Sequence, residues 1–91
     1  MTLDIILSNR FKKDLKLARK RNYNLDLLDE VVNALSTKQV LDEKYHDHPL
    51  SGDYAGFREC HIQPDWLLVN RIDYDEAFLL LSRTGTHSDL F

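Results

Sequence analysis

Two stretches of the chain repeat apolar residues at the spacing of an amphipathic helix. In the first stretch, Phe11, Leu15 and Ala18 recur at i, i+4 and i+7. The second stretch, from Leu28 to Leu35, has apolar residues at i, i+3, i+4 and i+7. Each pattern places one apolar stripe along a helix, so we expect two helices that each bury one face.

Polar residues mark where these two helices begin and end. Ser8 and Asn9 offer cap oxygens to the first helix, which runs to about Arg21. Asn24 or Asp26 can cap the second helix in the same way. Because the polar break between the helices is short, we expect them to form an antiparallel hairpin.

The other apolar runs are short and contain β-branched and aromatic residues, which favours strands. The predicted strands cover residues 3–7, 57–62, 66–72 and 77–82. Pro64 and Asp65 suit a tight turn, and the polar residues 73–76 suit a second hairpin turn. Residues 36–56 are expected to form a loop with one helical turn near 37–41. The tail 84–91 is expected to be irregular, although residues 88–91 could dock as a short turn.

The predicted order of elements is therefore β-α-α-β-β-β. This order is typical of an α+β fold in which a helical hairpin packs on an antiparallel sheet. With 91 residues, the chain is expected to form one domain over residues 1–91.

The net charge of −3 conceals an uneven distribution of charge along the chain. Residues 1–21 carry seven Lys or Arg against two Asp, a local charge of +5, whereas residues 22–91 carry −8. The basic residues, with Lys12, Lys13 and Lys16 among them, lie on the first predicted helix. Such a helix can contact a nucleic-acid backbone, although many charge runs are only solvated faces.

Composition excludes several classes of protein. Apolar runs are too short to cross a bilayer, and Met1-Thr-Leu-Asp lacks the regions of a signal peptide, so we expect a cytoplasmic protein without membrane contact. Cys60 is the only cysteine, which excludes an internal disulfide. His46 and His48 lack a third ligand at zinc spacing, so we expect neither a metal nor another cofactor.

Hairpin geometry predicts which polar side chains meet at one end of the sheet. With the last turn at residues 74–75, Trp66 lies opposite Arg83. With the preceding turn at residues 64–65, His61 lies one diagonal step from Trp66. A slip of two residues would put His61 directly opposite Trp66 and keeps the same parity, so in either register we expect His61, Trp66 and Arg83 to share a face; an odd-length loop would change this.

Other reactive residues are near the same end. His87 follows Arg83 by four residues, and Gly85 lets the chain turn back over the sheet. Histidine transfers protons near neutral pH, arginine binds phosphate oxygens, and Asp65 can orient an imidazole. The indole of Trp66 offers a surface on which a base can stack. Since RNA supplies its own 2′-hydroxyl nucleophile, this set predicts metal-free cleavage of RNA.

Each of these residues also has a structural interpretation. An arginine at a strand end is more often an ion-pair partner, and a tryptophan beside a turn is more often part of the core. A single histidine in a strand is usually packed or half-exposed. The convergence of several such residues at one end of the sheet favours the catalytic interpretation.

Four short motifs follow one another at close spacing in the second half of the chain. They are His48-Pro-Leu-Ser-Gly, Gly56-Phe-Arg-Glu-Cys-His61, Pro64-Asp-Trp-Leu-Leu-Val69 and Arg83-Thr-Gly-Thr-His-Ser-Asp-Leu-Phe91. With the basic first helix and the order of elements, they resemble the YafQ branch of the RelE/ParE superfamily, the toxins of type II toxin–antitoxin pairs. The resemblance covers essentially the whole chain and implies a RelE-like, microbial-RNase-like fold.

The resemblance implies an mRNA interferase that cuts messenger RNA in the ribosomal A site without a cofactor. It also implies a cognate antitoxin that keeps the toxin inactive, and binding of operator DNA only through that complex. The basic first helix would contact 16S ribosomal RNA.

The residues that match the family motifs fall into two groups. The catalytic group is His48, His61, Asp65, Arg83 and His87. The RNA-binding group is Trp66 and Phe91, to which we add Lys12, Lys13 and Lys16. Carried over from the family, His87 is the general acid to the leaving 5′-oxygen and Arg83 stabilises the phosphorane. His48, His61 or Asp65 activates the 2′-hydroxyl, and the expected product end is a 2′,3′-cyclic phosphate or the 3′-phosphate derived from it.

One position departs from the family pattern, and two other functions share the fold. Asn70 stands where the family commonly has tyrosine; we expect it mid-strand, opposite Leu79, with an effect on packing or antitoxin contact. The alternatives are a ParE-like gyrase poison and an antitoxin-bound co-repressor module without catalysis. Neither of them explains the presence of His61, Arg83 and His87.

Overall fold

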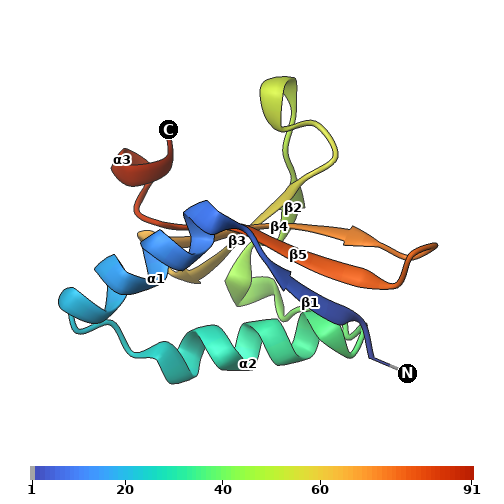
Figure 1. The fold of residues 1–91 in the computed structure, drawn as a ribbon, viewed down its shortest axis with the longest axis horizontal. Coiled ribbons are helices and arrows are strands. Elements are labelled where there is room, and N and C mark those ends of the chain that lie inside the picture. Colours follow the sequence, from blue (N-terminus) through green and yellow to red (C-terminus); the bar gives the residue numbers. More distant parts are fainter. Residues whose placement is uncertain (1) are drawn as a thin grey trace.

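A five-stranded sheet with helices on both sides makes up the computed structural model, which describes residues 2–91 (Figure 1). The helices are α1 (Asn9–Lys20), α2 (Leu25–Ser36) and α3 (His87–Leu90), with two single helical turns, η1 (Glu43–Tyr45) and η2 (Gly52–Tyr54). The strands are β1 (Asp4–Leu7), β2 (His48–Pro49), β3 (Arg58–Gln63), β4 (Trp66–Asp73) and β5 (Phe78–Gly85). No helix within residues 2–91 is long and apolar enough to cross a membrane.

The two long helices begin where the polar residues predict. The hydroxyl of Ser8 accepts a hydrogen bond from the backbone N–H of Phe11 at 3.0 Å and caps α1. The side chain of Asn24 accepts one from the N–H of Asp26 at 3.1 Å and caps α2. Between them Asn22 adopts a left-handed conformation, with φ of 59°, which ends α1 and lets the chain turn back.

The strand order is β1-β5-β4-β3-β2, and the α+β class with its helical hairpin is confirmed. Two details of the sheet differ from the prediction. β1 pairs with β5 in parallel, because the helical hairpin carries the chain over the sheet before the antiparallel strands begin. β2 is an additional strand that pairs with Arg58 and Glu59 of β3, and two residues are too few to show a sequence pattern.

The prediction of a helical turn near residues 37–41 is wrong. Lys38 adopts a left-handed conformation, with φ of 62°, so the chain leaves the helix there. The single turn lies instead at η1, where the side chain of Asp42 accepts a hydrogen bond from the N–H of Lys44 at 3.0 Å. The tail is also more regular than predicted, since it forms α3.

The predicted strand registers are wrong because each hairpin contains a bulge and because the last turn spans residues 74–77 instead of 74–75 alone. His61 lies opposite Leu67, and the pairing shifts by one residue before the turn. Arg83, on β5, lies opposite Val69 rather than Trp66, with a second shift beside it. Since one residue of slip reverses the face of a side chain, Trp66 does not share a face with His61 and Arg83.

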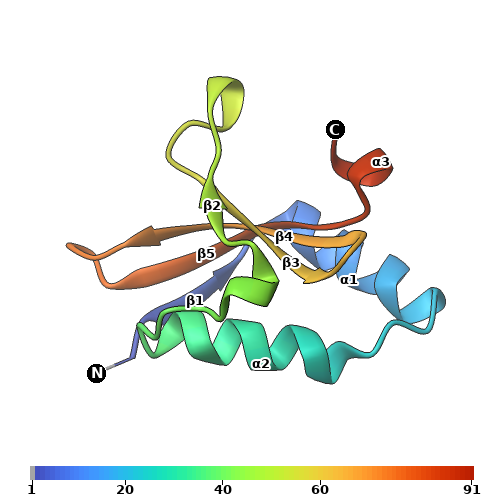
Figure 2. The same ribbon diagram turned by 180° about the vertical axis from the view of Figure 1, so that it is seen from behind.

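Each face of the sheet has its own core. Under α1 and α2, the side chains of Trp66 and Leu68 pack with Phe11 and Val31 in the larger cluster. On the opposite face, Leu67, Val69 and Leu90 form a smaller cluster with residues 50–57. Figures 1 and 2 show α2 on one side of the sheet and α3 with the η2 loop on the other. The second face is therefore only partly covered, and the reactive side chains lie at its edge.

Asn70 is fully buried in the sheet. It lies opposite Leu81 rather than the predicted Leu79, next to the bulge in β5. Its exposed fraction is 0%, and neither its amide nitrogen nor its oxygen has a hydrogen-bond partner within residues 2–91. An unpaired buried amide costs stability, so this position bears on packing.

Candidate active site

All four histidines of the chain lie side by side. The ring centroid of His61 is 5.7 Å from that of His46, 6.3 Å from that of His48 and 5.7 Å from that of His87. The four residues come from the loop after η1, from β2, from β3 and from α3. They are brought together by the short β2 pairing and by the return of the chain into α3. We call them the histidine cluster.

His87 is held by the turn between β3 and β4. Its backbone N–H donates to Oδ1 of Asp65 at 3.1 Å, and its ring Nδ1 lies 3.0 Å from the same oxygen. A carboxylate can only accept, so Nδ1 carries the proton and Nε2 is left for a ligand. Hydrogen bonds from the ring and the backbone of His87 hold the pKa of Asp65 below its ordinary value.

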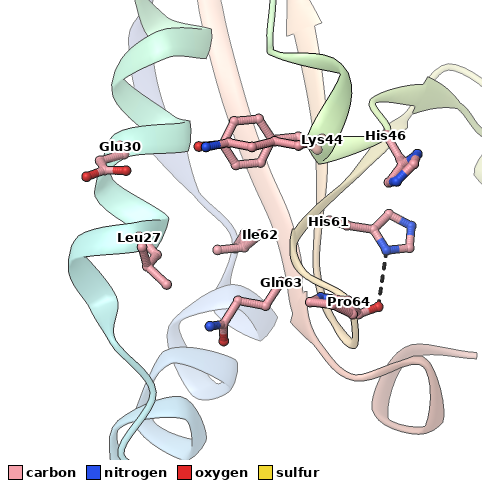
Figure 3. Close-up of a pocket in the computed structure, with 9 residues that line it drawn as sticks. Leu27, Glu30, Lys44, His46, His61, Ile62, Gln63 and Pro64 are labelled. Carbon is pink, nitrogen blue, oxygen red and sulfur yellow. Dashed lines mark hydrogen bonds between the residues drawn. The ribbon is translucent and has the colours of Figure 1, made fainter.

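His61 has a neutral partner instead. Its Nδ1 lies 3.3 Å from the carbonyl oxygen of Pro64, as the dashed line in Figure 3 shows. A carbonyl oxygen also only accepts, so Nδ1 donates and the lone pair of the neutral ring is on Nε2. The two neighbouring imidazoles, His61 and His87, therefore have the same tautomer but different supports: a carbonyl for one and a carboxylate for the other.

His48 has no free ring nitrogen. Its Nδ1 lies 2.6 Å from the carbonyl oxygen of His46, and its Nε2 lies 3.0 Å from Oε2 of Glu59. Both neighbours are acceptors, so neither ring nitrogen of His48 offers a lone pair to a ligand. The other oxygen of Glu59 is buried and has no partner within residues 2–91.

Arg83 is bound to the first helix. Its Nε and Nη2 donate to the two carboxylate oxygens of Asp14 at 2.8 and 3.2 Å, and the backbone N–H of Thr84 donates to Asp14 at 3.1 Å. The Asp14 carboxylate raises the pKa of Arg83, which keeps its charge throughout. The side chain is only 16% exposed, so its orientation is set by the fold.

α3 is tied to the end of the same helix. Arg21 donates to both carboxylate oxygens of Asp89 at 2.6 and 3.1 Å. Asp89 and Thr86 also cap each other across the first turn of α3. A Cβ atom at Gly85 would lie 2.9 Å from the Asp89 carboxylate, so a glycine is needed there.

The two aromatic residues expected to bind RNA have different environments. Trp66 is 2% exposed; its Nε1 donates to the hydroxyl of Thr84 at 2.9 Å, and its ring lies 4.9 Å from that of Tyr23. The structure thus places Trp66 in the core and away from the histidine cluster. Phe91 is 59% exposed, and its ring lies 5.4 Å from that of Tyr54.

Three acidic residues and one histidine complete the site but are missing from the sequence prediction. Asp14 carried one signal, as the only acidic residue among the basic residues 10–21. Glu59 and Asp89 carried none that separates them from surface acids. His46 was visible as half of a zinc-like pair, yet its neighbours are other imidazoles. Within residues 2–91, no group of three or more His, Cys, Asp or Glu side chains is arranged to hold a metal ion.

Sequence and structure comparisons agree along the whole chain. Residues 3–91 match the family described as the bacterial toxin of type II toxin–antitoxin system, YafQ. The mRNA interferase toxin YafQ of Escherichia coli K12 is 38% identical over 89 residues, which cover 97% of this chain and 95% of that protein.

Two solved structures have nearly the same fold. A metal-bound toxin from Helicobacter pylori superposes with a TM-score of 0.92 at 50% identity, over 98% of this chain and 99% of that one. A chain of the E. coli DinJ–YafQ toxin–antitoxin complex superposes with a TM-score of 0.90 at 37% identity, over 100% and 99%.

Proposed function

The chain belongs to the YafQ family of bacterial toxins of type II toxin–antitoxin systems, and we propose that it cuts messenger RNA on the ribosome by metal-free acid–base catalysis. It is an endoribonuclease of the mRNA interferase type, as is its E. coli relative. A cognate antitoxin is its proposed partner, since the E. coli relative is found in a complex with DinJ. Cleavage in the A site would place its action in the cytoplasm.

One observation supports the proposed mechanism: two imidazole rings have centroids 5.7 Å apart, and one is hydrogen-bonded to a carboxylate while the other is hydrogen-bonded to a carbonyl. The Asp65 carboxylate beside His87 suits a positively charged imidazolium, the form in which a general acid starts. The Pro64 carbonyl beside His61 suits a neutral ring whose Nε2 can accept a proton. The geometry therefore favours His87 as the acid and His61 as the base.

The other two candidates for the base are otherwise engaged. Asp65 already accepts two hydrogen bonds from His87. His48 has both ring nitrogens next to acceptors, so it has no lone pair free for a hydroxyl.

The reaction then proceeds by transfer within the RNA. Nε2 of His61 takes the proton of the 2′-hydroxyl, and the 2′-oxygen attacks the adjacent phosphorus. The bond from phosphorus to the 5′-oxygen breaks, and Nε2 of His87 gives its proton to that oxygen. The products are a 2′,3′-cyclic phosphate and a 5′-hydroxyl. Arg83 binds Asp14 through Nε and Nη2, which leaves Nη1 to donate to a phosphate oxygen.

Binding of the ribosome is assigned to the exposed face of α1. Lys12, Lys13 and Lys16 are all exposed there, and we propose that they contact phosphates of 16S ribosomal RNA. Phe91 and Tyr54 offer aromatic surfaces for a base near α3. Operator DNA would be bound only through the antitoxin complex.

The test separates the acid from the base by changing the leaving group. Messenger RNA with sulfur in place of the bridging 5′-oxygen at the cleaved position releases a thiolate, which needs no general acid because thiols ionise with a pKa of about 8.5. On programmed ribosomes with natural mRNA, His61→Ala and His87→Ala should each lower the cleavage rate by at least about 10²-fold. With the sulfur substrate, the cleavage rate of His87→Ala should return toward that of the wild type, whereas the rate of His61→Ala should stay low.

Two controls complete this experiment. A 2′-deoxy substitution at the attacking nucleotide should abolish cleavage, and free mRNA without ribosomes should be cut far more slowly. If both histidine variants cut natural mRNA at the wild-type rate, the proposed mechanism is wrong.

A further inference from the structure

A hollow of about 530 Å³ lies beside the histidine cluster and has no role in the mechanism above (Figure 3). One wall is α2, the opposite wall is the end of β3, and η1 closes one side. It exists because β2 pairs only with Arg58 and Glu59, which leaves the edge of β3 beyond them without a strand partner within residues 2–91.

The hollow is continuous with the site of reaction. His46 and His61 line it and also belong to the histidine cluster, with their ring centroids 5.7 Å apart. If His61 takes the proton of the 2′-hydroxyl, the nucleotide that carries this hydroxyl lies against this wall. Its base is then one ribose away and adjacent to the hollow.

The lining has the composition of a site for a planar, polar-edged ring. Leu27, Ile62 and Tyr45 supply apolar surface from three different elements. Imidazole and phenol rings are surfaces on which unstacked bases are held in single-stranded RNA. In size, the hollow falls within the range of about 300–1,000 Å³ of small-ligand sites.

Polar side chains surround this apolar surface. Gln63, Glu30 and Lys44 are all exposed and line the hollow from β3, α2 and η1. In Figure 3 the amide of Gln63 lies between α2 and the histidines. An amide both donates and accepts, a carboxylate accepts and an ammonium donates, so together they can read the edge of a base.

We propose that this hollow binds the base of the nucleotide whose 2′-hydroxyl attacks, and that Gln63 and Glu30 determine which base is preferred. The inference rests on the proposed ribonuclease function. Because Glu30 only accepts, bases with an exocyclic amino group bind better than uracil, which has none. The hollow is thus the specificity site of the enzyme, next to the groups that transfer protons.

Mapping of cleavage sites tests the assignment. On ribosomes programmed with a pool of mRNAs, Gln63→Ala and Glu30→Ala should each reduce the preference for the base on the 5′ side of the cut by about tenfold. Gln39→Ala and Glu76→Ala, which change the same residue types outside the hollow, should leave the preference unchanged. An unchanged preference in both hollow variants overturns the proposal.

Binding without cleavage provides the second measurement. Nucleoside 3′-monophosphates carry the same base and phosphate as the product, and backbone amide NMR shifts of Leu27, Lys44 and Ile62 should report their binding. Adenosine and cytidine 3′-monophosphates should shift these amides at lower concentration than the uridine compound. Shifts that are equal for all bases or confined to the histidines overturn the subsite while leaving the ribonuclease mechanism intact. Base-dependent shifts in a protein that cuts no mRNA would show that the hollow binds bases but would remove the proposed function, and with it the assignment to the attacking nucleotide.

Discussion

The proposed base and the proposed acid lie 5.7 Å apart but are held by different parts of the fold. His61 depends on its own hairpin, because its only ring partner within residues 2–91 is the carbonyl of Pro64, three residues away. His87 belongs to a segment held at long range: Asp65 binds its ring, and α3 is joined to α1 through Arg21 and Asp89.

Arg83, like the segment that carries His87, is held by a long-range contact. It is joined to α1 through Asp14, so the segment from Arg83 to α3 has two ion pairs with one helix. Arg83 and the helix that carries the acid are therefore joined to α1 and its C-terminal cap, while the base is positioned by a turn. Changes to α1 should alter the first half of the site and leave the second half unchanged.

The largest effect on the chemical step is expected at Arg83, in the half of the site that is joined to α1. Arg83→Ala should lower single-turnover cleavage on programmed ribosomes by about 10²-fold, because it removes charge from the phosphorane. Arg83→Lys should recover little, since an ammonium cannot bind Asp14 and a phosphate oxygen through the same planar fork. Circular dichroism should show both variants folded. Near-wild-type cleavage by Arg83→Ala would exclude Arg83 from the transition state.

A smaller effect is expected from the helix side of the same ion pair. Asp14→Asn keeps the shape of the side chain but removes its charge, so Arg83 loses a fixed orientation and the cleavage rate should fall by about tenfold. The free energy of unfolding, measured in urea, should fall by about 1–3 kcal/mol, because hydrogen bonds to a charged group are lost.

Asp29→Asn, on the exposed part of α2, is the matched control and should change neither quantity. Ribosome affinity should also stay constant in Asp14→Asn, since the exposed lysines of α1 are unaltered. Faster cleavage by Asp14→Asn would mean that Asp14 competes with the phosphate for Arg83. The positioning role would then be wrong.

The sequence predicts the helices far better than it predicts the contacts that orient the site. Ser8 and Asn24 cap their helices as expected, because an N-cap is a local interaction between a side chain and the next turn. The faces of the strands were predicted wrongly, since a bulge in each hairpin reverses the parity and no local signal marks either bulge. Trp66 is therefore in the core, and its expected role at the site remains an untested prediction.

The residues of the candidate site illustrate the same limit. His48, His61, Asp65 and His87 were selected from residue chemistry and family resemblance, and the structure brings them together. Asp14 and Asp89 were not selected, because each acts through an arginine more than 60 positions away in the chain. Contacts between residues so far apart depend on the tertiary fold and leave no periodic pattern.

A weaker, pH-dependent effect is expected at the second ion pair. Hydrogen bonds from Arg21 and from the N–H of Thr86 hold the pKa of Asp89 well below its ordinary value of about 3.9. The ionised carboxylate therefore stabilises the fold fully above that ordinary pKa, and this contribution is lost as the pH falls through the lower folded-state value. Asp89→Asn should be less stable than the wild type from pH 5 to 7.

The difference between the two proteins should begin to shrink below about pH 4, where Asp89 becomes protonated in the unfolded wild type, and should shrink further as the pH falls toward the lower folded-state pKa. Urea unfolding of both proteins at pH 6 and pH 3 measures the difference in their free energies of unfolding. Asp65 also has a lowered pKa, but it is present in both proteins and cancels in the comparison. A stability difference independent of pH would show that Asp89 acts through shape alone. At pH 7, cleavage by Asp89→Asn should fall less than cleavage by Asp14→Asn, because Asp65 still orients His87.

The exposed face of α1 should have the smallest effect on the chemical step. Lys12, Lys13 and Lys16 form no ion pair with any residue from 2 to 91. Replacing them with glutamine therefore leaves the Arg83–Asp14 and Arg21–Asp89 ion pairs intact. The rate of cleavage by bound enzyme should be unchanged, but the affinity for the ribosome should fall. The slope of log affinity against log salt concentration should become shallower by about one for each lysine that contacts a phosphate. Lys38→Gln, in the loop after α2, should change neither quantity.

An unchanged salt dependence in the triple variant would make these lysines a solvated face. A slower chemical step in bound enzyme would show that the exposed side of α1 is coupled to the side that holds Arg83 and α3, and the separation of binding from positioning would then be wrong.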